Sequence, residues 1–214
     1  IEEFASLKNY PSSTNPQAIF MAGCPGAGKT EFSKGLIEEL NKNEPEAKIV
    51  RIDADEVKEK IPQYDGTNST EIQGASALGV QKLFDQVKKH RQSFILDGTF
   101  SNLKLATQNI ESCIKRNFKT GVFYIYQDPL VAWGFSKKRE RLEGRFVPKD
   151  FFIESLFSSY ENVDKVKEMY KDKITLYLVI KDIQNKVKKT FFNIQRVADH
   201  LKIPYNKQNL QRAI

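Results

Sequence analysis

The chain has 214 residues, of which 40% are hydrophobic and 29% charged, with a formal net charge of +7. No apolar run reaches the roughly 18 residues of a membrane span, and no signal-like segment opens the sequence, so we expect a soluble cytoplasmic protein without membrane contact. The two cysteines, Cys24 and Cys113, predict a reduced protein without a disulfide. The positive charge suits either nucleic acid or a polyanionic small substrate and does not choose between them.

Strand-like and helix-like segments alternate along the chain. The continuous apolar runs expected to form strands are residues 17–23, 47–53, 93–99, 120–127 and 174–181. The amphipathic patterns expected to form helices are residues 32–40, 78–87, 105–116 and 151–170. Strands buried on both faces that alternate with helices predict the α/β class, here a three-layer sandwich around a mainly parallel sheet of five strands.

The pattern changes beyond Lys181. Residues 182–195 contain two strand-like pieces separated by a polar turn, and residues 196–203 and 206–214 resemble short helices. We therefore expect one domain, residues 1–182, with residues 183–214 as a small hairpin and helical extension packed on it.

The stretch FMAGCPGAGKT, residues 20–30, concentrates three glycines between a predicted strand and a predicted helix. Gly23, Gly28, Lys29 and Thr30 have the spacing G-x-x-x-x-G-K-[ST] of a P-loop, in the context that this motif requires. Lys29 is expected to contact the β- and γ-phosphates of a nucleoside triphosphate, and the Thr30 hydroxyl to ligate Mg²⁺. The expected nucleotide-binding residues are Gly23, Cys24, Pro25, Gly26, Ala27, Gly28, Lys29 and Thr30.

Residues after the P-loop indicate which reaction the nucleotide serves. The fourth predicted strand is not followed by N-K-x-D, the motif that reads guanine, which weakens a GTPase switch. A kinase needs a base for the acceptor hydroxyl. Asp53 and Asp55 follow the second predicted strand, at the edge where open α/β sheets bind ligands. Asp55 is the expected base, whereas Asp53 could contact the acceptor or cap the next helix.

Two further segments add candidate site residues. Asp97 ends the third predicted strand, where it could hold Mg²⁺ or the acceptor, or simply form a turn before Gly98; Thr99 would then line the acceptor pocket. The segment KKRERLEGRFVP carries Arg139, Arg141 and Arg145, a composition that suits a mobile lid over the phosphates. The alternative for these arginines is a solvated helix face, and Arg145 is the least compatible with it because it lies beyond the helix.

Four segments in this order, GCPGAGKT, IDADEVKEKIPQYD, ILDGTF and KRERLEGRFVP, resemble the zeta toxin family of P-loop kinases and, more loosely, chloramphenicol phosphotransferase. The similarity covers about residues 15–180. It implies ATP-dependent phosphorylation of a sugar hydroxyl, with UDP-N-acetylglucosamine as the substrate and a protein antitoxin as a partner. Asp55 would be the base, Asp97 and Thr99 would flank the acceptor, and Arg141 and Arg145 would contact phosphate.

The chain also departs from the family pattern. Asp97 stands where the toxins often have glutamate, and Gln81 lies near the position of a substrate-contacting glutamate, so a different acceptor remains open while the kinase chemistry is still expected. A polynucleotide or nucleoside 5′-hydroxyl kinase is one alternative, although the basic residues are spread along the chain. A nucleotide-binding partner protein without catalytic activity is the other.

Overall fold

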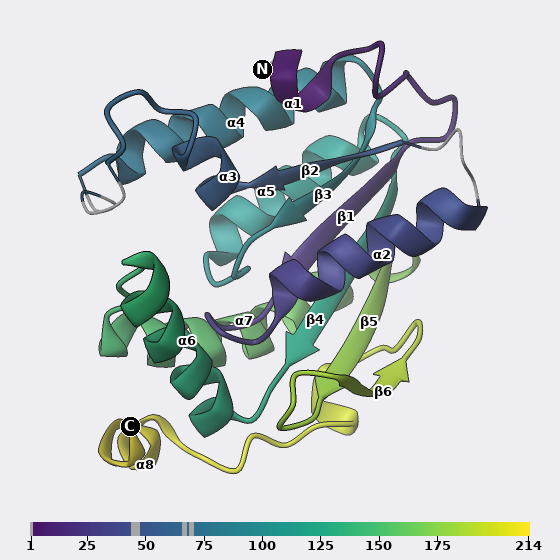
Figure 1. Ribbon diagram of the computed structural model, residues 1–214. Coiled ribbons are helices and arrows are strands. Elements are labelled where there is room, and N and C mark those ends of the chain that lie inside the picture. Colours follow the sequence, from purple (N-terminus) through teal and green to yellow (C-terminus); the bar gives the residue numbers. More distant parts are fainter. Residues whose placement is uncertain (1, 44–47, 66–67, 69–70) are drawn as a thin grey trace.

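The computed structural model describes residues 2–43, 48–65, 68 and 71–214, and its centre is a six-stranded sheet in the order β2-β3-β1-β4-β5-β6. The strands are β1 (Gln17–Ala22), β2 (Ile49–Asp53), β3 (Ser93–Asp97), β4 (Lys119–Tyr126), β5 (Ile174–Lys181) and β6 (Val187–Phe191). The first five are parallel, and β6 is antiparallel to β5. In Figure 1 the arrow of β2 ends at α3, and the arrow of β4 points toward the side of the sheet where α6 lies.

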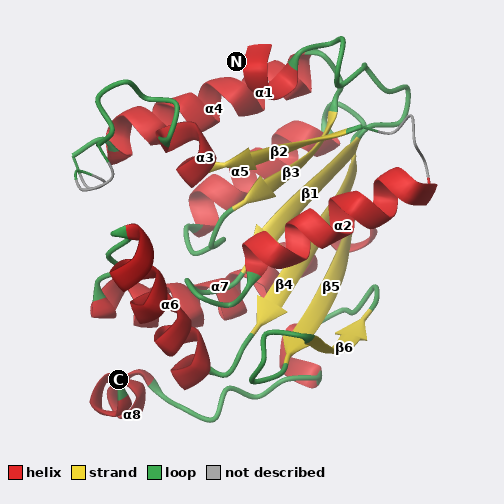
Figure 2. Ribbon diagram, viewed as in Figure 1, coloured by secondary structure: helices red, strands yellow, loops and turns green. Residues whose placement is uncertain are grey.

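Eight α-helices surround the sheet in the described part of the chain. They are α1 (Glu2–Ala5), α2 (Lys29–Asn43), α3 (Ala54–Lys58), α4 (Gln73–Lys89), α5 (Leu103–Ile114), α6 (Pro129–Glu143), α7 (Lys149–Tyr170) and α8 (Lys207–Ala213). Two short 3₁₀ turns, η1 (Lys171–Lys173) and η2 (Val197–Asp199), complete the fold. In Figure 2 helix α2 crosses one face of the sheet, while α4 and α5 lie behind the other.

The alternation of side chains along the strands divides the core into two layers. On β1, Ala18 and Phe20 belong to the cluster that α4 and α5 cover, whereas Ile19 and Met21 belong to the cluster that α2 covers. Because successive residues of a strand point to opposite faces, a strand covered on both sides must be apolar throughout. This is why residues 17–22 read as a continuous apolar run.

Capping residues fix where the helices of the site begin and end. The Asp53 side chain accepts a hydrogen bond from the Asp55 amide at 2.8 Å and so starts α3 directly after β2. Asp128 caps α6 in the same way, and Gly144 ends that helix with a left-handed φ of +68°. These caps turn the chain sharply at the carboxyl edge of the sheet, where the candidate site lies.

Most of the expected elements are confirmed, with three differences. The sheet has six strands and not five, because the strand-like piece after the polar turn that follows β5 joins the same sheet as an antiparallel edge strand. Residues 196–203 form only the η2 turn and no α-helix. Leu78, expected on the apolar face of its helix, is 56% exposed. Cys24 and Cys113 are free and buried, and none of the described helices is long and apolar enough to cross a membrane.

Candidate active site

The loop between β1 and α2 has the shape that its glycines predict. Gly26 and Gly28 adopt φ values of +75° and +80°, which residues with a Cβ rarely reach. A Cβ at Gly26 would lie 2.0 Å from the Ala132 carbonyl oxygen, and one at Gly28 would lie 2.1 Å from Asn185 Oδ1. The loop is therefore pressed between α6 and the β5–β6 turn, with its chain leading into the amino end of α2. Such an end, with its unpaired N–H groups, favours phosphate.

Lys29 lies at the centre of this loop. Its Nζ donates hydrogen bonds to the carbonyl oxygens of Gly23 at 3.0 Å and Cys24 at 2.8 Å. Burial lowers the pKa of Lys29, and the negative charge of Asp97 opposes that shift. The ammonium group is thus fixed by the backbone that surrounds it and can reach an anion held by the same loop.

A cavity of about 760 Å³ opens between the P-loop, α3, the end of β3 and α6. Its wall brings together residues that are far apart in the sequence: Lys29 and Thr30, Asp53 and Asp55, Asp97 and Thr99, and Arg139 and Arg145. Of the residues expected to bind the nucleotide, Pro25, Gly26, Gly28, Lys29 and Thr30 line the cavity, whereas Gly23, Cys24 and Ala27 do not and instead form the base of the loop.

Asp55, the expected base, lies on the cavity wall in the first turn of α3. Its Oδ2 forms an ion pair with Nη2 of Arg145, and its Oδ1 lies 3.6 Å from Lys58 Nζ. Both the Asp55 and Arg145 side chains are about 30% exposed, so the pair faces the solvent in the cavity. This contact joins β2 and α3 to the segment after α6, two parts of the site that sequence patterns alone could not place side by side.

Arg51 is a site residue that sequence reasoning missed. Its guanidinium pairs with Asp53 and, at 2.6 Å, with Asp97 Oδ2. The sequence did carry a signal: a charged residue interrupts the apolar run of residues 47–53, two positions before Asp53 and so on the same side of the strand. Because a buried charge needs a partner, this position indicated an ion pair.

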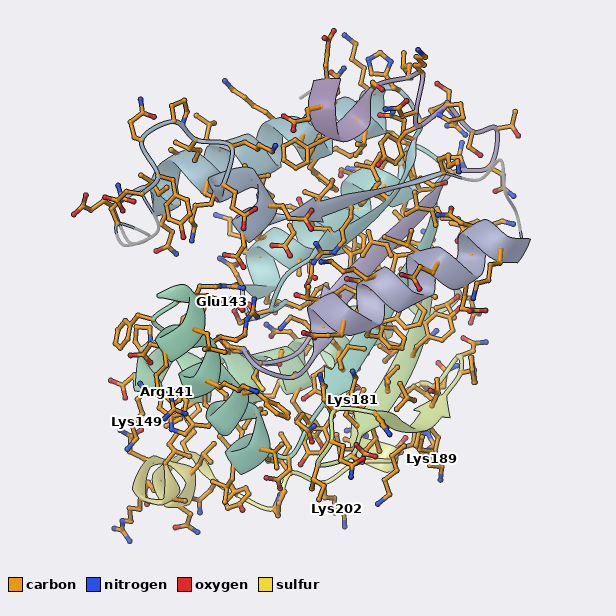
Figure 3. All side chains as sticks on the ribbon, viewed as in Figure 1. Arg141, Glu143, Lys149, Lys181, Lys189 and Lys202 are labelled. Carbon is orange, nitrogen blue, oxygen red and sulfur yellow. The ribbon has the colours of Figure 1, made fainter. Side chains whose placement is uncertain are left out.

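The arginines after β4 do not all reach the cavity. Arg139 and Arg145 line it, whereas Arg141 is exposed and does not. In Figure 3 Arg141 lies on the outer side of α6, toward Lys149. The expectation that Arg141 contacts phosphate is therefore not supported by its position, because two residues along an α-helix turn a side chain by about 200°. Arg139 occupies the inward position instead.

A second cavity of about 290 Å³ adjoins the first and shares Asp97, Gly98 and Thr99 with it. Phe84, Leu96 and other apolar side chains line it, together with the hydroxyl and amide groups of Thr99, Ser101, Asn102 and Asn109. Gln81 stands at its exposed rim and donates a hydrogen bond to Asp85 at 3.2 Å. The residues expected to contact the acceptor thus divide between two connected cavities, with Asp97 and Thr99 at the junction.

Thr30 and Asp97 are residues of the larger cavity that could hold a magnesium ion. Mg²⁺ takes oxygen ligands and is usually held by one or two protein groups together with substrate phosphates. Thr30 and Asp97 both line the larger cavity. Within the described residues, the hydrogen bonds to Asp97 go to its Oδ2, so its Oδ1 is available as a metal ligand. The described part of the chain contains no group of three or more His, Cys, Asp or Glu that could hold an ion without a substrate.

Solved structures confirm the fold. One is from the PezAT chromosomal toxin–antitoxin system of Streptococcus pneumoniae, with a TM-score of 0.65 at 17% identity, over 86% of this chain and 74% of that chain. An AvrRxo1-ORF1:-ORF2 complex matches with a TM-score of 0.68 at 13% identity, over 88% of this chain but only 63% of the other. The Pnkp1/Rnl/Hen1 RNA repair complex matches at 0.56 and 18% identity, over 89% and 52%.

No curated protein matches this chain. A sequence-family model does identify its family. The family model described as Zeta toxin matches residues 1–196, which include the P-loop, both cavities and the segment that carries Arg139 and Arg145. The chain therefore belongs to the zeta toxin family and is a kinase-type phosphotransferase.

Proposed function

We propose that this protein transfers the γ-phosphoryl group of ATP to a hydroxyl of a nucleotide sugar, UDP-N-acetylglucosamine or a close relative. One observation carries the proposal: a single cavity joins the P-loop cation Lys29, the carboxylate of Asp55 and the cations of Arg139 and Arg145. A phosphate site, a base and a charged lid are the parts that phosphoryl transfer requires.

Asp55 is the proposed general base. Its carboxylate accepts the proton of the acceptor hydroxyl while that oxygen forms a bond to the γ-phosphorus. The bond between the γ-phosphorus and its bridging oxygen breaks, and ADP leaves. Asp53 has less freedom for this role, because its Oδ1 caps α3 and its Oδ2 pairs with Arg51.

Lys29, Arg139 and Arg145 are the proposed charge-stabilising residues. Preorganised cations act most strongly where negative charge develops during transfer. Arg145 is paired with Asp55 across the cavity, so it must exchange this carboxylate for phosphate as the lid takes up the substrate. The exchange also frees Asp55 to accept a proton. Mg²⁺ bound at Thr30 and Asp97 would neutralise phosphate charge.

The walls of the cavities support a nucleotide sugar as acceptor. Lys58 and Lys138 line the larger cavity in addition to the P-loop and lid cations, which suits a substrate that brings a diphosphate of its own. The smaller cavity offers apolar surface with amide and hydroxyl groups, which suits an uncharged ring. Gln81 at its rim lacks the charge that the resemblance implies, so the sugar contacts are expected to differ in detail.

A polynucleotide 5′-hydroxyl kinase is the second candidate. Phe135, Phe146 and Phe151 line the larger cavity beside Lys138 and Arg139, and aromatic rings next to cations are the features on which single-stranded nucleic acids stack. The fold similarity to an RNA repair complex agrees with this candidate without deciding it. The nucleotide sugar remains the first choice because these rings line the same cavity as the P-loop and Asp55, whereas a strand of several nucleotides needs a groove that continues along its backbone.

A protein antitoxin is the proposed partner. The family to which the chain belongs is that of a toxin, and the structural relatives include a toxin–antitoxin system and a two-protein complex, one form of which holds ATP. A protein that binds nucleotide with such a partner and does not catalyse transfer would show ATP binding without turnover.

The test is product analysis. The protein is incubated with ATP, MgCl₂ and one acceptor at a time, namely UDP-N-acetylglucosamine, a nucleoside or an oligonucleotide with a 5′-hydroxyl, and the mixtures are analysed by mass spectrometry. We expect a phosphorylated nucleotide sugar, with none formed by the Lys29→Met variant. A phosphorylated oligonucleotide alone would favour the second candidate, and ATP binding without any phosphorylated product would contradict both.

A further inference from the structure

Arg51 sits at the centre of a charged network beneath the larger cavity. Its Nη2 bonds to Oδ2 of both Asp53 and Asp97, and its Nη1 bonds to Glu56. Its Nε donates to Ser33 Oγ at 3.0 Å, and Ser33 lies in the second turn of α2, immediately after the P-loop. One side chain on β2 therefore connects β3, α3 and the P-loop helix.

Burial makes this network an internal feature of the site. The Arg51, Asp53 and Asp97 side chains are only 8%, 11% and 5% exposed. Asp53 and Asp97 are also direct neighbours in the register of β2 and β3, so their carboxylates leave the sheet side by side. Two carboxylates this close repel each other unless a cation lies between them.

A divalent metal ion is the usual alternative cation for such a pair of carboxylates, since Mg²⁺ and Ca²⁺ prefer oxygen ligands. In this protein the planar guanidinium already supplies the charge and donates to both carboxylates at once. It is held on its other side by Ser33 and Glu56 and cannot leave without breaking those contacts.

We propose that Arg51 is a positioning residue that acts as a built-in cation: it fixes Asp53 and Asp97 together and prevents a divalent ion from binding between them. Metal is then restricted to the side of the cavity where Thr30 and Oδ1 of Asp97 lie. There, two protein oxygens are too few to hold an ion alone, so the ion binds together with the nucleotide.

The direct test measures metal binding to the protein alone, by titration with Mn²⁺ followed by electron paramagnetic resonance. Arg51→Gln removes the cation and leaves both carboxylates, so we expect it to bind Mn²⁺ at least about tenfold more tightly than the unmodified protein. The double variant Arg51→Gln with Asp97→Asn should lose this gain. Arg116→Gln is the control, because Arg116 is an exposed arginine in the turn after α5, and it should bind as the unmodified protein does.

A Mn²⁺ affinity of Arg51→Gln equal to that of the unmodified protein, in a variant that melts cooperatively, would overturn the proposal. This measurement does not depend on the proposed function, because it uses neither ATP nor an acceptor.

The positioning role is tested with Arg51→Lys, which also serves if Arg51→Gln does not fold. Lysine keeps the positive charge but lacks the planar fork that reaches two carboxylates and Ser33. We expect no new Mn²⁺ site, and turnover about tenfold lower with the KM for ATP unchanged. Unreduced turnover would show that Arg51 does not position the carboxylates. This second part rests on the proposed function, so a lack of turnover in the unmodified protein would count against that function. The Mn²⁺ titration would still test whether Arg51 excludes a divalent ion from the two carboxylates.

Discussion

Replacement of Asp55 by asparagine separates the proposed chemistry from the stability of the site. Asparagine has nearly the same shape but cannot accept the proton of an acceptor hydroxyl. Loss of a general base typically lowers the rate by about 10²–10⁴-fold. Since each tenfold change corresponds to about 1.4 kcal/mol, the expected rise of the activation barrier is about 3–5 kcal/mol.

The effect of this substitution on folding should be much smaller. The Asp55–Arg145 ion pair is lost, but both side chains are about 30% exposed, and exposed pairs contribute about 0.2–1 kcal/mol. The cap of α3 survives, because it uses the Asp55 amide and the side chain of Asp53. For a chain of this size the melting temperature should fall by no more than about 4 °C.

Steady-state turnover, ATP affinity by calorimetry and thermal unfolding check the prediction. Glu161→Gln is a matched control, because Glu161 is an exposed carboxylate with an ion pair to Lys165 on the far part of α7. Turnover of Asp55→Asn close to that of Glu161→Gln would refute Asp55 as the base. A larger loss in Asp53→Asn than in Asp55→Asn would assign the role to Asp53 instead.

Three further predictions follow from the contacts of single residues. Lys29→Met should lower turnover by at least about 100-fold and weaken ATP binding while the protein still melts cooperatively, since the hydrogen bonds of the ammonium within the described residues go to loop carbonyls; wild-type kinetics would contradict it. Arg139→Ala should lower turnover by about 10²–10³-fold, because Arg139 lines the larger cavity. Arg141→Ala, on the outer side of α6, should change turnover by less than about twofold. Equal effects of the two substitutions would contradict the assignment of Arg139 to the cavity side of α6. Burial raises the pKa of Cys24 to about 11 and of Cys113 to about 12, so both thiols should resist iodoacetamide at pH 8 and react only after unfolding, as followed by mass spectrometry.

The fold was largely readable from the sequence because its strands are covered on both faces. Burial on both sides requires continuous apolar runs, and such runs are visible without a structure. The sixth strand was less visible, because β6 is an edge strand in which Lys188 and Lys189 are exposed. Its residues read as a hairpin piece, and nothing local indicates that the hairpin extends the main sheet.

The site residues that belong to one local motif could be predicted from the sequence. Those that segments far apart in the chain bring together could be predicted less well. The P-loop spacing predicts Lys29 and Thr30 because strand, loop and helix are adjacent in the chain. The choice among Arg139, Arg141 and Arg145 depends on how α6 is rotated against the cavity, which the composition of a charged helix does not determine. Arg51 depends on two carboxylates from neighbouring strands, and only the register of β2 with β3 brings Asp97 to it.

We propose that the larger cavity supports phosphoryl transfer to a hydroxyl and not simple ATP binding or hydrolysis. The most direct measurement is ³¹P nuclear magnetic resonance of the protein with ATP, MgCl₂ and UDP-N-acetylglucosamine, recorded as the reaction proceeds. We expect ADP and a new phosphomonoester of the nucleotide sugar to appear together in equal amounts. Formation of ADP with inorganic phosphate alone, or unchanged ATP in the presence of folded protein and each acceptor of the panel, would contradict it.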